Sequence, residues 1–112
     1  MSTNIYDIAN ELERAIRNLP EYKAVEVVKV SVAGNPEAKE ILESYIAFQK
    51  GIQEKLQAGD IPTEEDQKTM LDFNKKVQAN PILVEYFTKQ QQLATYVADL
   101  ERIIFKPLNE LL

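Results

Sequence analysis

The chain is a small acidic protein of 112 residues, and this length predicts one domain, residues 1–112, whose folding buries roughly 60–70% of the unfolded chain's surface. Hydrophobic residues make up 45% and charged residues 28% of the sequence, which excludes intrinsic disorder. The 13 basic residues are scattered among 18 acidic ones, so the net charge of -5 argues against a nucleic-acid partner.

Two absent residue types exclude most site chemistry. Without cysteine there is no disulfide, thiolate metal site, iron–sulfur cluster or thiol catalysis. Without histidine the commonest general base and metal ligand is missing. We therefore expect no enzyme activity, no catalytic residue, no cofactor and no metal. The first residues lack a secretory signal and no apolar run reaches about 18 residues, which predicts a cytoplasmic protein with no membrane partner.

The first predicted helix begins after Thr3 or Asn4, which are typical N-caps. Its apolar residues recur every three or four positions, the pattern of one amphipathic stripe: Ile5, Ile8, Leu12, Ala15, Ile16 and Leu19. Pro20 either ends this helix or begins a second one, since proline is tolerated only in the first turn.

The valine-rich segment 22–33 has the propensity of a β-strand. No second strand-like run exists to pair with it, and a lone strand leaves its backbone groups unsatisfied. We therefore predict a helix, with Tyr22, Val25, Val28 and Val32 on one side. Val27 and Val30 are then exposed or packed against a neighbour.

Two further helices carry clear start and stop signals. Asn35-Pro36 begins one, and Gly59 is a plausible stop. Its apolar stripe is Ala38, Ile41, Leu42, Tyr45, Phe48, Ile52 and Leu56. Thr63 and Asp66 resemble a capping box at the start of the next helix, so the acids at 64–66 are expected to stabilise that helix rather than bind metal. This helix is expected to turn inward Met70, Leu71, Phe73, Asn74 and Val77.

The last and longest helix, opened by Asn80-Pro81, carries the most informative pattern. Seven residues on alternating three- and four-residue steps form a coiled-coil-like line, called the seam below: Leu83, Tyr86, Gln90, Leu93, Val97, Leu100 and Ile104. Pro107 and Leu111 continue the same steps. A second apolar set lies off the seam: Ile82, Phe87, Ala94, Ile103, Phe105 and Leu108.

A helix that is apolar on more than one side must be covered from more than one direction. One explanation is that the seam is an intrachain core. The favoured interpretation is a homo-oligomer, dimer or higher, in which a second copy covers one side. Gln90 occupies a core-type position, where it either points at solvent or pairs with a polar partner and fixes register.

A further protein partner of unknown identity needs surface outside the seam. Exposed aromatic side chains anchor many interfaces, which makes Tyr45 and Tyr96 candidates for the partner surface. The alternative for each is a core position with the hydroxyl group reaching outward.

The order of these segments resembles the YlbF/YmcA family of small bacterial helical proteins, most closely its YheA-like branch. The resemblance runs from Ile5 to Leu108 through the stretches LPEYK, NPEAKEILESYIAFQ, LQAGDIPTEED and NPILVEYFTKQQQLATYVADLERII. It implies an all-α bundle that self-associates, in agreement with about four to five predicted helices and a long C-terminal one.

The same resemblance implies a function. Better-known relatives are regulatory accessory proteins in competence, sporulation and biofilm control, form complexes with other proteins and influence an RNA-processing endonuclease. Some hold iron–sulfur clusters through cysteines, a property that does not transfer to this cysteine-free chain. The expected function is a non-enzymatic regulatory adaptor. The alternative is a structural or small-ligand-binding helical bundle with no regulatory partner.

Overall fold

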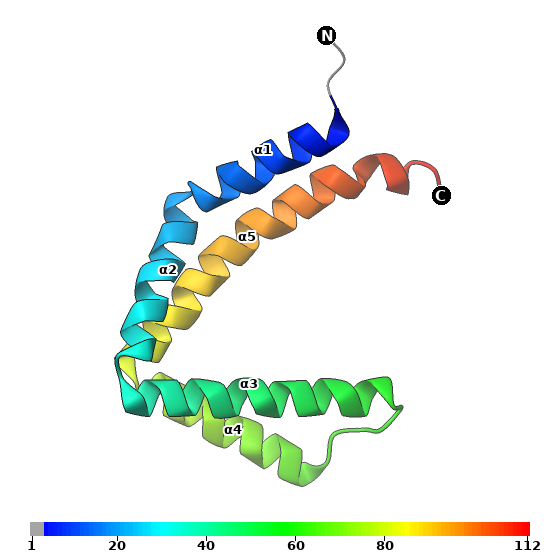
Figure 1. Cartoon of the computed structure of the whole chain (residues 1–112). Coiled ribbons are helices and arrows are strands. Elements are labelled where there is room, and N and C mark those ends of the chain that lie inside the picture. Colours follow the sequence, from blue (N-terminus) through cyan, green and yellow to red (C-terminus); the bar gives the residue numbers. More distant parts are fainter. Residues whose placement is uncertain (1–3) are drawn as a thin grey trace.

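The computed structural model describes residues 4–112, and this part of the chain folds into five helices without a strand. They are α1 (Ile5–Arg17), α2 (Pro20–Ala33), α3 (Pro36–Gln57), α4 (Glu64–Gln78) and α5 (Pro81–Asn109). Two arms meet at a corner: α1 and α2 lie along α5 in one arm, and α3 with α4 forms the other (Figure 1). The predicted all-α fold with a long C-terminal helix is confirmed.

The valine-rich segment is helical, as predicted. Val28 and Val32 are buried on the side of α2 that faces the core, and Val27 and Val30 are exposed on the other side. Burial of one valine face therefore outweighs the strand propensity of the sequence, because tertiary packing supplies most of the stability of a protein helix. Of the two roles predicted for Pro20, the structure shows the second: Pro20 is the first residue of α2.

Two matching Asn-Pro turns build the corner. Asn35 caps α3 by accepting a hydrogen bond from the backbone N–H of Ala38 at 2.9 Å. Asn80 caps α5 in the same way, accepting from the backbone N–H of Leu83 at 3.3 Å. Ala38 and Leu83 are the fully buried residues at the two helix starts.

The buried residues of the corner form one small cluster: Val32, Ala38, Leu42, Val77 and Leu83. Each of the helices α2, α3, α4 and α5 contributes at least one side chain to it. The four helices are therefore tied together near their ends, and the two arms project away from this point (Figure 1).

The fold as a whole is thin and extended. The chain measures 57 × 38 × 16 Å and its radius of gyration is 18.3 Å, whereas a compact chain of this length has a radius of gyration of about 13 Å. It exposes 8940 Å², where a compact 12.8 kDa protein exposes about 6,300 Å². The chain by itself thus leaves a large surface that a typical domain of its size buries.

An aromatic cluster holds α3 and α4 against the start of α5. The ring of Tyr45 packs edge-on against Phe73 and Phe87, with ring centroids 5.6 Å apart in both pairs. Phe48 lies 5.5 Å from Phe73. On α4 the buried stripe is narrower than predicted: Leu71 and Asn74 were expected inward and are exposed, because α4 is covered along one side by α3 and α5.

Gly59 ends the α3 cap with a left-handed backbone, at a φ of 87°. The backbone N–H of Asp60 reaches back to the carbonyl of Lys55 at 2.9 Å, and that of Gly59 to Leu56 at 3.1 Å. This is a Schellman motif, in which glycine avoids the steric cost of the left-handed conformation. The predicted stop is confirmed.

We expect Gly59→Ala to destabilise the protein by about 1–2 kcal/mol, because an alanine Cβ disfavours the left-handed backbone. The melting temperature should fall by roughly 4 °C or more. The matched control is Gly51→Ala inside α3, where a Cβ meets no atom within 4 Å. This control should gain about 0.5–1 kcal/mol, since alanine is the better helix former. Thermal unfolding followed by circular dichroism measures both, and equal shifts would contradict the assignment.

The predicted capping box at the start of α4 is confirmed and extended by a lysine from α3. Thr63 Oγ1 accepts from the backbone N–H of Asp66 at 3.1 Å, and the Asp66 carboxylate accepts from the backbone N–H of Thr63 at 3.0 Å. Lys55 Nζ donates to the same carboxylate at 2.9 Å. The Thr63 N–H and the Lys55 ammonium lower the pKa of Asp66, because both favour its charged form.

A lowered folded-state pKa means that the charged carboxylate stabilises the fold at neutral pH, and that this contribution is lost as pH falls through the folded pKa. We expect Asp66→Asn to unfold more easily than the parent at pH 7. The difference should shrink once pH drops below the ordinary aspartate value near 3.8. Urea midpoints measured across this range provide the check, and a difference that is independent of pH would assign the effect to geometry instead.

Candidate association surface

The structure divides the predicted seam into two halves. Leu83 is buried in the corner, and Tyr86 and Gln90 are half-buried beside α2. Leu93 and Leu100 are also half-buried, whereas Val97 and Ile104 are exposed. The near half of the seam is thus intrachain core, as one of the two interpretations holds.

Towards the end of α5 the cover from the chain itself disappears. Every residue from 101 to 112 is exposed. Ile104 is 51% and Leu108 55% exposed. The sequence spacing placed Leu108 off the seam, but it is four residues after Ile104 and therefore lies next to it on the helix surface, on the same side as Val97 and Leu100. We call Val97, Leu100, Ile104 and Leu108 the distal strip.

A second apolar surface on α5 lies off this strip. Tyr96 is exposed, and Ile103, which is seven residues further on and on the same side of the helix, is 68% exposed. At 3.6 residues per turn this side is about a quarter-turn from the distal strip. The two sides meet at Leu100, which is four residues after Tyr96 and three before Ile103, so the second half of α5 carries one broad apolar surface with two neighbouring sides.

The two aromatic candidates have different surroundings. Tyr45 is half-buried between Phe73 and Phe87, and its hydroxyl accepts a hydrogen bond from Gln49 Nε2 at 2.8 Å. Tyr45 thus occupies a core position with its hydroxyl group outward, the alternative for this residue. Tyr96 is free of such packing and 44% exposed, so it is the candidate that retains an accessible ring.

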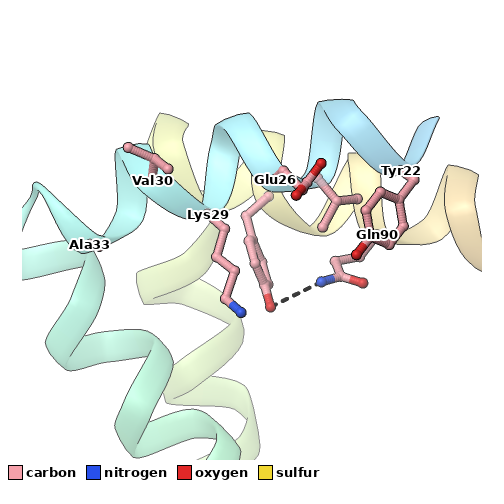
Figure 2. Close-up of a pocket in the computed structure, with 8 residues that line it drawn as sticks. Tyr22, Glu26, Lys29, Val30, Ala33 and Gln90 are labelled. Carbon is pink, nitrogen blue, oxygen red and sulfur yellow. Dashed lines mark hydrogen bonds between the residues drawn. The ribbon is translucent and has the colours of Figure 1, made fainter. Parts of the chain in front are cut away.

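Gln90 is half-buried and finds its polar partner on its own helix. Its Nε2 donates to the Tyr86 hydroxyl, one turn earlier, at 3.1 Å. Figure 2 shows this bond within a groove between α2 and α5, with the Lys29 ammonium on the same side. The groove holds about 570 Å³ and is lined by Tyr22, Val25, Glu26, Lys29, Val30, Ala33, Tyr86 and Gln90.

The sequence did not predict this groove, because its polar residues are spread over two helices that meet in space. Tyr22 and Gln90 are 68 positions apart in the chain, and Figure 2 shows their side chains close to one another. The apolar spacing of each helix was a signal for the contact between them. It carried no signal for the polar groups at its edge.

Two kinds of feature are absent from residues 4–112, a cluster of metal ligands and a membrane-spanning helix. No group of three or more acidic side chains in this part of the chain lies together as metal ligands would. Among the same residues, no helix is both long and apolar enough to span a membrane. The acids at 64–66 stand instead in the first turn of α4, with Asp66 in the capping box.

The family described as "Control of competence regulator ComK, YlbF/YmcA" matches residues 5–109. The chain belongs to this family. Its description fits a regulatory role, and it names no enzyme activity. The predicted resemblance to YlbF/YmcA proteins is therefore confirmed, and the closer likeness to a YheA-like branch stays a prediction.

Similar proteins extend over the full length of the chain. A UPF0342 protein of Streptococcus suis is 88% identical over 112 residues, covering 100% of both chains. A UPF0342 protein of Streptococcus gordonii is 52% identical over 110 residues, with 98% of each covered. A solved "Protein of Unknown Function (DUF964) from Bacillus stearothermophilus" has the same fold, with a TM-score of 0.84 at 22% identity over 96% of this chain and 94% of that one.

We predict that Gln90→Leu raises the melting temperature by a few degrees and leaves the distribution of oligomers unchanged. Gln90 lies beside α2 of its own chain and donates to Tyr86 of its own helix, so a leucine there adds buried apolar area without altering a contact between copies. The Tyr86 hydroxyl then turns to water at the open groove. Gln92→Leu, at an exposed position of the same helix, is the control and should change neither quantity. Calorimetry and sedimentation velocity measure the two quantities; a broadened distribution of oligomers with Gln90→Leu would place this side chain between copies instead.

Proposed function

We propose that this protein is a non-enzymatic regulatory adaptor of the cytoplasm, which acts through helix-mediated association with itself and with another protein. The observation that carries the proposal is the apolar surface of α5, whose second half is exposed on two neighbouring sides. A contiguous exposed apolar surface on a small protein is typical of an interaction site. The family description, control of a competence regulator, supports a regulatory role.

The two faces of α5 suggest a division of labour. The distal strip continues the seam, so it suits contact with another copy of the chain. Tyr96 and Ile103 lie on the neighbouring side, about two turns apart, and an exposed aromatic ring is the kind of anchor that partner proteins bury. An adaptor needs such surface in addition to what its own oligomer consumes.

We expect Tyr96→Ala to remove the partner protein without altering the fold or the oligomer. Crosslinking in the native cell followed by mass spectrometry should recover one partner with the parent chain and lose it with Tyr96→Ala. Ile103→Ala should weaken the same crosslinks. Val27→Ala, exposed on α2, is the matched control and should keep the partner. Circular dichroism and light scattering confirm that each variant keeps its structure and mass.

Two results would count against the adaptor. One is recovery of the chain itself as the sole crosslinked protein under every growth condition. The other is a partner that is retained by both Tyr96→Ala and Ile103→Ala. In either case the groove between α2 and α5 favours the second candidate function, small-ligand binding. Its volume lies in the usual range of about 300–1,000 Å³. The groove is open to solvent, with Lys29 and Glu26 exposed at its edge, and an open groove buries less of a ligand than an enclosed pocket does. Small-ligand binding is therefore the second candidate function, after the adaptor.

A further inference from the structure

α1 is a helix whose apolar face is largely uncovered by its own chain. Ile5 is 74% and Ile8 50% exposed, while Leu12 and Ile16 are half-buried; none of the 13 residues of α1 is buried. An isolated helix of this length is marginally stable in water. The apolar side chains of α1 therefore stay largely exposed within the chain, and burying them requires contact with another molecule.

The neighbour of α1 in the arm is α5, but the two helices do not pack. Figure 1 shows α1 running beside the C-terminal half of α5, with the start of α1 and the end of α5 at the same end of the arm. No Cα atom of α1 comes within 8 Å of a Cα atom of α5. Packed helices have axes 8–10 Å apart and bring many Cα pairs closer than this. α1 is held at its other end, by contact with α2.

Two apolar strips are therefore uncovered at one end of the molecule. The first consists of Ile5 and Ile8 on α1, and the second of Ile104 and Leu108, the exposed end of the distal strip on α5. Cover decreases along both helices in the same direction, from half-buried Ile16 and Leu93 near the middle of the arm to exposed Ile5 and Leu108 at its end. An occupant must therefore reach both strips from the open end of the arm.

We infer that the occupant is a second copy of this chain, whose own α1 and distal strip pack against the same two segments to form an intermolecular four-helix bundle. The inference rests on the self-association in the proposed function. It adds α1 to the interface between the two copies, which the seam on α5 alone does not include. Four helices around one apolar core is a common stable arrangement. A two-fold axis places the same strips on both sides, so the assembly closes at two copies.

Surface area is the first argument for a second copy. The chain exposes roughly 2,700 Å² more than a compact protein of its mass. Obligate homodimers bury about 1,000–2,500 Å² from each subunit. The surplus is therefore at or slightly above the largest area that such a dimer buries from each subunit, and every copy of the chain exposes it.

Charge is the second argument. Around the α1 strip, Asp7 and Glu11 are followed by Arg14, and around the distal strip Asp99 and Glu101 are followed by Arg102 and Lys106. Both strips thus carry charges of both signs, which avoids the repulsion that a one-signed surface meets in a copy of itself. A partner of one strong charge has no complementary surface here.

The first experiment measures mass. Light scattering of the full chain at about tens of micromolar should give two chains, twice 12.8 kDa. Ile8→Asp and Ile104→Asp should each weaken the dimer at least about 100-fold, because a two-fold interface would bury two unpaired carboxylates per variant. Val27→Asp, on the exposed side of α2, should remain a dimer. Leu93 and Leu100 are unsuitable positions, since they are half-buried against the chain itself.

The second experiment does not require a destabilised variant. Because the chain has no cysteine, single substitutions provide unique attachment points. Ile8→Cys mixed with Ile104→Cys should give covalent dimers with a short bismaleimide, and Val27→Cys should not. Retained circular dichroism shows that each variant is folded.

A monomeric parent chain would overturn the inference, as would crosslinking through Val27→Cys as efficient as through Ile104→Cys, or dimers that persist in both aspartate variants. These failures are separable from failure of the adaptor role. A monomer that loses its partner protein on Tyr96→Ala keeps that role and lacks the bundle, whereas a dimer crosslinked through Ile8→Cys without any partner has the bundle and lacks the role.

Discussion

Everything in this fold depends on the corner that the two Asn-Pro turns create. In each turn the asparagine side chain accepts a backbone hydrogen bond from the residue three positions on, and that residue, Ala38 or Leu83, is fully buried. The proline between them fixes a helical φ and has no N–H to satisfy. The same Asn-Pro motif thus begins the helix, turns the chain at the corner and determines which side chain of the first helical turn is buried. Because α3 and α5 both begin in this way, four helices meet within a core of five residues.

A core at one corner leaves the arms as thin layers, and this decides what kind of function the protein suits. The α3–α4 arm closes on itself through the ring contacts of Tyr45, Phe48 and Phe73, together with the Lys55–Asp66 ion pair. The α1–α2–α5 arm is closed where α2 lies along α5 and open beyond it. A protein built in this way offers long helix faces and one open groove, and these surfaces support the proposed association with other proteins.

The sequence predicted best what neighbouring residues decide. The caps at Asn35, Thr63 and Asn80 and the stop at Gly59 are local, and all are confirmed. The helical valine segment followed from a missing strand partner. What the sequence did not decide was which helix covers which part of a regular stripe. The seam of α5 has one spacing throughout, yet Leu83 is buried and Ile104 is exposed, because α2 packs along the first half of α5 and α1 lies beside the second half without coming as close. Tyr45 and Tyr96 differ in a similar way: Tyr45 packs against Phe73 and Phe87, whereas Tyr96 is 44% exposed.

If the open end of the arm is completed by a second copy, then self-association and partner binding are linked through one helix. The distal strip and the face of Tyr96 and Ile103 belong to the same segment of α5, residues 96–108, in which no residue is fully buried within the chain. Such a helix end is ordered most firmly when one of its faces is covered. A dimer would therefore present the Tyr96 face on a rigid helix, and the cost of ordering it would already be met before the partner arrives. Linkage is reciprocal, so a bound partner would tighten the dimer by the same factor. An adaptor of this design responds to its own concentration, and its regulatory output follows the amount of the chain in the cell.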